Sequence, residues 1–163
     1  MAIGEQRATL AELLQLQPYY NVATVANGEP WNSPVWAARD EAFNLYWSSW
    51  TQAVHSRNIA TNPRAFLTLY DSTRQRGTNN FRCLYLQCSA SEVTDQIEAE
   101  KAAKLLYPNE AIQISDFHGA GLKRFYKAIP IRAWLNSLSE RQLTPETIKM
   151  RLEISLHDLR SAT

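Results

Sequence analysis

Hydroxyl, imidazole and guanidinium groups gather in one short stretch near the middle of the sequence. The candidates are Ser48, Ser49, Thr51, His55, Ser56 and Arg57. A phosphate monoester needs hydrogen-bond donors together with positive charge, and the N-terminus of a helix supplies both. The guanidinium of Arg57 can donate to two phosphate oxygens, while hydroxyl and backbone N–H groups complete the shell. The stretch is therefore a candidate phosphate site, although an ordinary polar surface helix explains the same pattern.

Tryptophans recur near this stretch and allow two interpretations. They are Trp31, Trp36, Trp47, Trp50 and Trp134. Their rings could stack against the plane of a flavin or a haem, whereas packing in a core or an interface is their usual role. Trp36, Trp47 and Trp50 lie close in sequence to the candidate phosphate site. A cofactor that combines an aromatic ring with a phosphate would need both kinds of surface.

Other chemistries find little support in the sequence. It contains no G-x-S-x-G nucleophile elbow, no P-loop and no G-x-G-x-x-G fingerprint. His55, His118 and His157 lack the spacing of metal ligands, so we predict no metal site. The pattern names no catalytic residue.

The composition limits the classes of function. The 163 residues fit one domain, 1–163, with a sizeable core. The 17 Lys and Arg residues nearly balance the 16 Asp and Glu residues, so the net charge of +1 would draw neither nucleic acid nor an acidic membrane. No apolar run approaches the roughly 20 residues that span a bilayer, and the N-terminus does not resemble a signal peptide. Cys83 and Cys88 are expected to be reduced, which is typical of a cytoplasmic protein.

Hydrophobic periodicity predicts a helix followed by three strands. The apolar helix face consists of Leu10, Leu13 and Leu14. The helix is expected to end at Pro18. The strands are predicted at Tyr20–Ala26, Trp31–Arg39 and Phe43–Ser49. Asn27-Gly28 is a strong signal for a two-residue hairpin turn, and we interpret the three strands as an antiparallel meander.

A short helix is predicted after these strands. Thr51 can cap its start, and Asn62-Pro63 ends it near Thr61 because a residue before proline avoids the helical conformation. The strand pattern returns at Ala65–Tyr70 and Arg82–Val93. The polar segment Asp71–Asn80 between these strands indicates a loop.

One further helix is predicted in the second half of the chain. Asp95 with Glu98 forms a capping-box-like start, and Tyr107-Pro108 marks the end. The inward face is expected to consist of Ile97, Ala102, Leu105 and Leu106.

The C-terminal third is less regular. Gly119 and Gly121 mark flexible points within 109–123, and a strand is predicted at 125–136. Pro130 requires that this strand lie at an edge or contain a bulge. Thr144-Pro145 is a good helix start, whereas an alternating pattern is formed by Leu152, Ile154 and Leu156. We favour a short helical turn followed by a strand.

Six or seven short strands with a few helices predict a small, closed or nearly closed antiparallel barrel. A barrel of this size fills its interior with side chains. A ligand must therefore bind outside it, in a groove or at a subunit interface.

Three segments in order, ATVANGEPWNSPVW, LYWSS and HSRNIATNPRAFLTLYDST, carry a family resemblance. The chain resembles the pyridoxamine 5'-phosphate oxidase-like, FMN-binding split-barrel proteins from about Tyr20 to Trp134. The resemblance implies a mainly β fold with flanking helices, a six- to seven-stranded antiparallel split β-barrel. It also implies a homodimer that binds FMN between its two subunits.

The resemblance further implies a role for particular residues. Val35 and Trp36 would border the isoalloxazine ring, and Trp134 of the opposite subunit would close the pocket. The ribityl and phosphate side would be formed by Trp47, Ser48, Ser49, His55, Ser56 and Arg57. His55 stands where many relatives carry a phosphate-binding lysine.

The Arg-x-His substrate pair of the vitamin B6 oxidase is missing near the C-terminus, so oxidation of pyridoxamine phosphate is not predicted. We expect an FMN-dependent oxidoreductase acting on an unidentified small molecule. The alternatives are a non-catalytic protein that stores or senses flavin or haem, and a purely structural or interaction protein.

Overall fold

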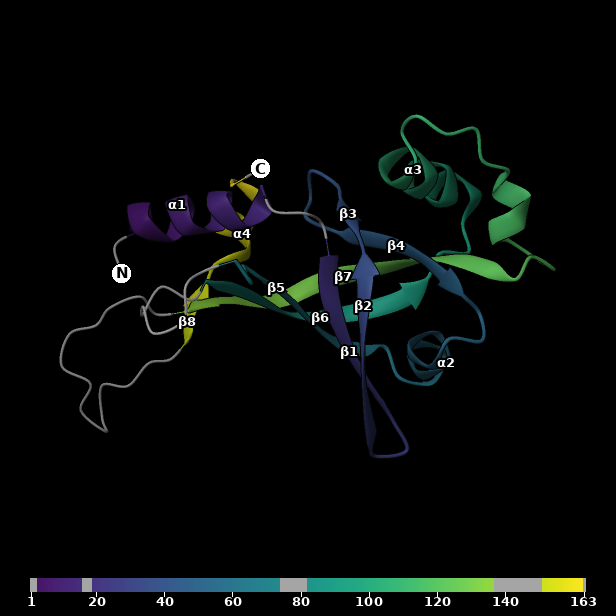
Figure 1. Cartoon of the computed structure of the whole chain (residues 1–163), viewed down its shortest axis with the longest axis horizontal. Coiled ribbons are helices and arrows are strands. Elements are labelled where there is room, and N and C mark those ends of the chain that lie inside the picture. The colour runs from purple at the N-terminus through teal and green to yellow at the C-terminus, as the bar shows by residue number, and fades with distance from the viewer. Residues whose placement is uncertain (1–2, 16–18, 74–81, 137–150, 163) are drawn as a thin grey trace.

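The computed structural model describes residues 3–15, 19–73, 82–136 and 151–162 (Figure 1). The helices are α1 (Ile3–Leu14), α2 (Val54–Thr61), α3 (Gln96–Leu106), α4 (Leu156–Arg160) and the 3₁₀ helix η1 (Ile114–Phe117). The strands are β1 (Tyr19–Ala26), β2 (Glu29–Trp36), β3 (Ala38–Arg39), β4 (Leu45–Trp50), β5 (Arg64–Tyr70), β6 (Cys83–Glu92), β7 (Lys123–Asn136) and β8 (Arg151–Ile154). Pro18 and the segments 74–81 and 137–150 lie outside the described residues, and with them most of the predicted loop and Thr144-Pro145.

The described strands form one antiparallel sheet that curls on itself. Their order is β2-β1-β5-β6-β7-β4-β3, and β8 pairs with β7 beside this path. Strands β2 and β3 lie at opposite ends of the order, yet Ala37 alone separates them in the chain. The two ends of the sheet must therefore meet at Ala37, because one residue spans only about 3.5 Å. This arrangement confirms the predicted mainly β split barrel with flanking helices.

The β1–β2 hairpin confirms the predicted turn. Asn27 and Gly28 have φ values of 52° and 82°, the left-handed conformation that a type I′ turn requires at both central positions. The predicted meander is confirmed only in part at its third strand. Strand β4 pairs antiparallel with β3, which is the end of the predicted second strand, but its longer partner is β7, with Trp47 opposite Tyr126. An alternating pattern identifies a strand and its faces but contains no information about its partner.

The inner face of the curled sheet holds the main core. Fully buried side chains include Val22, Leu45, Trp47, Leu67, Leu86 and Leu135. Helix α1 covers one end of this core, and Leu10, Leu13 and Leu14 are buried as predicted. Leu159 of α4 joins the same cluster, and α1 and α4 lie side by side in Figure 1.

Helix α3 and η1 cover the outer face of the sheet over β4 and β7. The Asp95 side chain accepts a hydrogen bond from the Glu98 N–H at 2.9 Å, which confirms the predicted cap. The helix packs against Tyr46 and Phe125 through four buried residues, Ala99, Ala102, Ala103 and Leu106. The predicted inward face is wrong at Ile97, which is 78% exposed. The small alanine side chains let the helix approach the sheet closely. Ile97 does not lie on this alanine face and therefore points to solvent.

The long strand β7 contains the irregularity that Pro130 requires. Cys88 pairs with Pro130 while Gln87 pairs with Arg132, so β7 has an extra residue and a bulge at this point. The predicted final strand is real but shorter than expected. Strand β8 ends at Ile154, and Ser155 then caps α4 by accepting from the Asp158 N–H at 3.0 Å. The expectation that Leu156 continues the strand is therefore wrong, because the serine cap starts a helix.

Gly121 is a point of close packing rather than the predicted flexible point. A Cβ atom there would overlap the carbonyl oxygen of Asp116 and lie 2.7 Å from its carbonyl carbon. Its N–H donates to the His118 carbonyl at 2.9 Å. Arg124 closes the same turn by donating to the Gly121 carbonyl at 2.6 Å. The segment that leads into β7 therefore depends on the absence of a side chain at this position.

Replacement of Gly121 by alanine is expected to lower the free energy of unfolding by about 1–3 kcal/mol, the usual cost of overpacking. Gly4→Ala is the matched control, because a Cβ at Gly4 has no atom within 4 Å. Alanine within a helix is also favoured over glycine by roughly 0.5–1 kcal/mol. Urea unfolding of both variants would measure the difference, and equal stability of the two would contradict the packing argument.

Candidate functional site

Helix α2 begins without a side-chain cap. The predicted cap at Thr51 is wrong, because the helix starts at Val54 with Ala53 as its N-cap residue. The Thr51 N–H instead donates to the Leu122 carbonyl at 2.9 Å and ties this turn to the segment before β7. No acidic residue stands in the first turn of the helix. The start of α2 therefore keeps its partial positive charge, which suits an anion.

His55 and Ser56 turn toward the barrel. His55 is 7% exposed, and its Nδ1 lies 3.1 Å from the Ser33 hydroxyl of β2. The same hydroxyl accepts a hydrogen bond from Trp31 Nε1 at 2.9 Å. Burial lowers the pKa of His55, so its imidazole is neutral near pH 7. Its Nε2 is buried and has no hydrogen-bond partner within the part of the chain that the structure describes.

Asparagines fix α2 across the end of the barrel. Asn58 Nδ2 donates to the Thr24 hydroxyl at 3.1 Å, and Asn62 Nδ2 donates to the Val25 carbonyl at 3.1 Å. Both partners lie on β1. Arg57 directly precedes the first anchor and lies on the exposed side of the helix. The anchors thus leave the Arg57 guanidinium on the solvent side, next to the uncapped helix start.

Strand β4 presents its predicted residues to opposite faces. Trp47 is buried and stacks on Tyr126, with ring centroids 5.7 Å apart, and its Nε1 has no partner among the described residues. Ser48 points outward, and its hydroxyl lies 2.7 Å from the Tyr107 hydroxyl. Ser49 is half-buried opposite Arg124. The strand therefore contributes the Ser48 hydroxyl to the outer face, whereas Ser49, the next residue, faces the opposite side.

Tyr107 is a site residue that sequence reasoning missed. It is the C-cap residue of α3, where the sequence indicated only the end of a helix. Its ring meets Trp36 edge to face, with centroids 6.5 Å apart and planes at 68°. Trp36 is 42% exposed, whereas its neighbour Val35 is buried in the core. Trp36, Tyr107 and Ser48 thus form one outer wall, although they come from β2, α3 and β4.

Trp134 lies on the outer face but far from this wall. Cross-strand partners form one row across five strands: Pro34, Asn21, Thr68, Tyr85 and Trp134. Measured along the curled sheet, four intervals of about 4.8 Å between neighbouring strands lie between Pro34 and Trp134, a path of roughly 19 Å. Ser48 of the wall pairs with Phe125, nine residues before Trp134 on β7, which is roughly 30 Å along the strand at about 3.3 Å per residue. Trp134 stacks instead on Phe66, with centroids 6.1 Å apart. Within one chain, Trp134 and the Trp36 wall do not border the same small ligand.

A cluster of charged groups holds α3, and with it Tyr107, against β4. Asp40 accepts hydrogen bonds from Lys101 Nζ at 2.6 Å, from the Asn44 N–H at 2.7 Å and from the Tyr46 hydroxyl at 3.1 Å. Tyr46 also donates to Glu98 of α3. Burial alone would raise the pKa of Asp40, but the hydrogen bonds from Lys101 and Asn44 outweigh it and lower the pKa to about 2. Asp40 is therefore ionised at neutral pH.

The described residues contain no group of three or more His, Cys, Asp or Glu side chains arranged to hold a metal ion. None of the described helices combines the length and the apolar character needed to cross a bilayer.

A family model described as pyridoxamine 5'-phosphate oxidase matches residues 7–136. The chain belongs to this family. The match covers the barrel from α1 to the end of β7 and includes every predicted site residue. No curated protein matches the sequence significantly.

Solved structures with low sequence identity share the fold. A haem-binding protein from Mycobacterium smegmatis has a TM-score of 0.69 and 15% identity, covering 99% of this chain and 61% of that protein. A putative pyridoxamine 5'-phosphate oxidase from Listeria innocua has a TM-score of 0.59 and 14% identity over 82% of this chain and 96% of that one. An FAD-binding protein from Mesorhizobium loti has a TM-score of 0.59 and 16% identity over 77% and 90%. The chain thus spans less than two thirds of the haem-binding protein.

Acid should loosen α3 through Asp40. Because the folded-state pKa lies below the usual 3.8, the stabilisation is complete above that value and is lost as the pH falls toward about 2. We expect Asp40→Asn to lower the free energy of unfolding by about 1–2 kcal/mol at neutral pH, after discounting for solvent screening. The difference from wild type should shrink as the pH falls from about 5 to about 2.5.

Urea unfolding at several pH values would measure this effect. Glu41→Gln, which removes the neighbouring exposed carboxylate, is the control and should leave the stability almost unchanged. A pH-independent difference between Asp40→Asn and wild type would show that the Asp40 charge is not the stabilising feature.

Proposed function

We propose that the protein is a homodimeric flavoprotein that binds FMN on the outer face of the barrel and performs redox chemistry on a small molecule. The observation that carries this proposal is the start of α2. It has no side-chain cap and no acid in its first turn, and Arg57 stands exposed beside it. A phosphate dianion there would gain backbone donors, the partial charge of the helix and a guanidinium.

The remaining predicted residues fit the other parts of FMN. Ser49 can donate to the phosphate or ribityl side, and the wall of Trp36, Tyr107 and Ser48 offers an aromatic edge with hydroxyl groups. FMN, when bound, would supply hydride transfer to or from its ring. The chain's own residues would orient the ring, donate hydrogen bonds to it and exclude water. His55 would support this site from beneath, since its ring points to Ser33.

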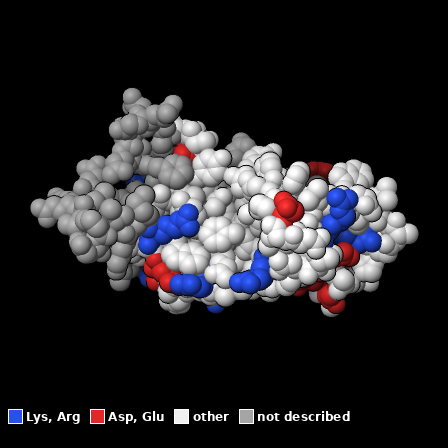
Figure 2. Space-filling model, turned by 90° about the horizontal axis from the view of Figure 1, so that it is seen from below, with Lys and Arg blue, Asp and Glu red and all other residues white. Residues whose placement is uncertain are grey.

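A second copy of the chain supplies what one barrel lacks. Trp134 lies far along β7 from the wall of Trp36, Tyr107 and Ser48, so one ring would touch both only if Trp134 came from a partner. Exposed large apolar side chains on the molecule include Tyr19, Trp36, Tyr70, Ile129 and Ile131. These side chains are available for contact with a second copy of the chain. The face in Figure 2 has an uncharged middle, with Lys and Arg as well as Asp and Glu side chains around it, and the uncharged middle suits an aromatic ring.

The two cysteines support a reducing location. Cys83 and Cys88 are buried free thiols, and burial raises their pKa to about 11 and about 12. Such thiols are chemically inert. We propose a cytoplasmic flavoprotein on this basis.

Haem binding without turnover is the second candidate, favoured by the likeness to the haem-binding protein from Mycobacterium smegmatis. The absorbance spectrum of the purified protein separates the two ligands, since flavin and haem absorb in different bands. A haem spectrum, or failure to take up FMN, would overturn the flavin proposal. FMN uptake without activity across a panel of electron donors would favour storage or sensing over catalysis.

Arg57→Ala is expected to weaken FMN binding by about 1.5–3 kcal/mol, the scale of a hydrogen bond to a charged group. The expected reason is loss of the guanidinium beside the uncapped helix start. The control is Arg64→Ala, because Arg64 is also exposed but lies on β5, beyond the helix. Fluorescence titration of FMN with the folded variants would measure both, and equal affinities would remove Arg57 from the site.

Mixing two defective variants tests the dimer. Arg57→Ala and Trp134→Ala should each bind FMN poorly alone. If every site takes Arg57 from one chain and Trp134 from the other, hybrid dimers regain one intact site. Random exchange of subunits then restores about a quarter of the wild-type sites. No recovery on mixing, with hybrid dimers verified by native mass spectrometry, would place both residues of each site in one chain.

A further inference from the structure

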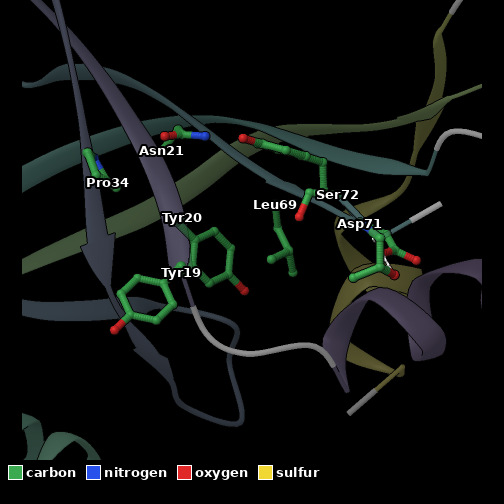
Figure 3. A pocket seen from close by; sticks show the side chains of 9 residues that line it. Tyr19, Tyr20, Asn21, Pro34, Leu69, Asp71 and Ser72 are labelled. Carbon is green, nitrogen blue, oxygen red and sulfur yellow. Dashed lines mark hydrogen bonds between the residues drawn. The ribbon is translucent and has the colours of Figure 1, made fainter. Parts of the chain in front are cut away.

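The row of cross-strand partners on the outer face ends at strand β8. Pro34 and Asn21, at the start of the row, line a pocket of about 350 Å³ at the rim of the barrel (Figure 3). Trp134 lies at the far end of the row on β7, and Glu153 of β8 is its cross-strand partner. The flavin proposal uses Trp134, so the side chains around this indole determine how it is presented to a ligand.

Glu153 holds Arg132 in a bidentate ion pair. The Nε of Arg132 donates to Oε1 of Glu153, and Nη2 donates to Oε2, both at 2.8 Å. The two side chains are 51% and 50% exposed. Ion pairs with this exposure contribute little to stability, whereas the two parallel bonds fix the direction of the planar guanidinium. The pair is therefore better suited to orienting a group than to stabilising the fold.

The register of the strands brings this guanidinium to the indole. Glu153 stands opposite Trp134, two residues further along β7 than Arg132, so the Arg132 side chain must extend along the strand to reach it. The central guanidinium carbon consequently lies over the Trp134 ring, 4.8 Å from its centroid. A guanidinium at this distance is attracted to the face of an indole. The Glu153 carboxylate thus keeps a cation on the ring of Trp134.

Aromatic rings of two neighbouring strands complete the surroundings of the indole. Phe66 of β5 stacks on Trp134, with centroids 6.1 Å apart and planes at 27°. Tyr85 is the cross-strand partner of Trp134 on β6, and its ring lies 6.3 Å from that of Phe66. These contacts are apolar and weakly directional. Trp134 is only half-buried, so part of its ring can still meet a ligand.

We propose that Glu153 is a positioning residue that acts through Arg132 to hold the Trp134 indole in one orientation for the flavin. This role rests on the proposed function, in which Trp134 closes the site of the other subunit. The contact itself is a property of one chain and does not depend on the cofactor. Glu153 lies outside residues 7–136, so the family match does not account for it.

The indole N–H resonance of Trp134, identified by its loss in Trp134→Phe, reports on the surroundings of the ring. Glu153→Gln keeps the size of the side chain and removes the charge that holds Arg132. We expect this variant to shift or broaden the Trp134 resonance in the NMR spectrum, while the midpoint of urea unfolding stays close to that of wild type. An unchanged resonance would overturn the positioning role.

Glu92→Gln is the matched control. Glu92 accepts a hydrogen bond from Arg124 Nε at 2.8 Å, so this variant also removes a carboxylate that pairs with an arginine of β7. Arg124 lies near the start of that strand and Trp134 near its end, so the control should leave the Trp134 resonance in place. A comparable shift in Glu92→Gln would show that the resonance responds to any lost ion pair on β7, which would overturn the assignment.

Arg132→Met tests whether Glu153 acts through the guanidinium. Because Glu153 stands opposite Trp134, it could also influence the indole directly. Methionine keeps an unbranched apolar stem and removes the cation. If Glu153 acts through Arg132, Glu153→Gln should cause no further shift of the Trp134 resonance in the Arg132→Met protein. An equal shift in both backgrounds would show a direct effect of Glu153 and overturn the proposed route.

The flavin role has its own readout. Glu153→Gln and Arg132→Met should each weaken FMN binding by about two- to fivefold, the value of an exposed cation–π contact, whereas Glu92→Gln should not. Unchanged FMN affinity in both variants would overturn the role of Glu153 in the flavin site. Failure of the wild-type protein to bind FMN would overturn the flavin proposal, while the Trp134 resonance would still decide whether Glu153 holds the indole through Arg132.

Discussion

The passage of the chain from β2 to β3 through Ala37 is the constraint on which the rest of the structure depends. Because these strands occupy opposite ends of the sheet, the sheet must curl until its ends meet. Ala37 is 2% exposed, and its small side chain suits the crowded point of closure. The curl encloses one face and fills it with side chains such as Trp47 and Leu86. Ligand chemistry is thereby confined to the outer face and to the ends of the barrel.

On the outer face of the sheet, the candidate site forms only where another element packs against the strands. Helix α3 docks through alanines, and the cluster around Asp40 holds it in register with β4. The members of the cluster lie far apart in the chain, and Lys127 completes it from β7 with a bond to Glu98 of 2.7 Å. The docked helix ends at Tyr107, which then meets Trp36 and Ser48. The charge cluster therefore has a structural role: it fixes α3, and the end of α3 places Tyr107 in the candidate site.

Local signals in the sequence were sufficient for most elements. Asn27-Gly28 and Asp95 predict their turn and cap correctly because the interactions involve residues two or three positions apart. Thr51 and Ile97 fail because tertiary contacts decide: the Leu122 carbonyl takes the Thr51 N–H, and the alanine row turns Ile97 to solvent. The local sequence pattern also could not predict that β4 pairs with β7. Closure through Ala37 brings β7 beside it, and no periodicity encodes that choice.

At the candidate site, too, local sequence signals predict some features and tertiary contacts decide the others. The sequence located the polar stretch and the start of α2, but it could not tell that His55 faces Ser33 while Arg57 faces solvent. Helical periodicity predicts that α2 has a buried face, but it does not say which polar residues lie on that face. The bonds from Asn58 to Thr24 and from Asn62 to Val25 decide this, because they tie one side of the helix to β1. With that side fixed, Arg57 is left on the exposed side, where an anion can reach it.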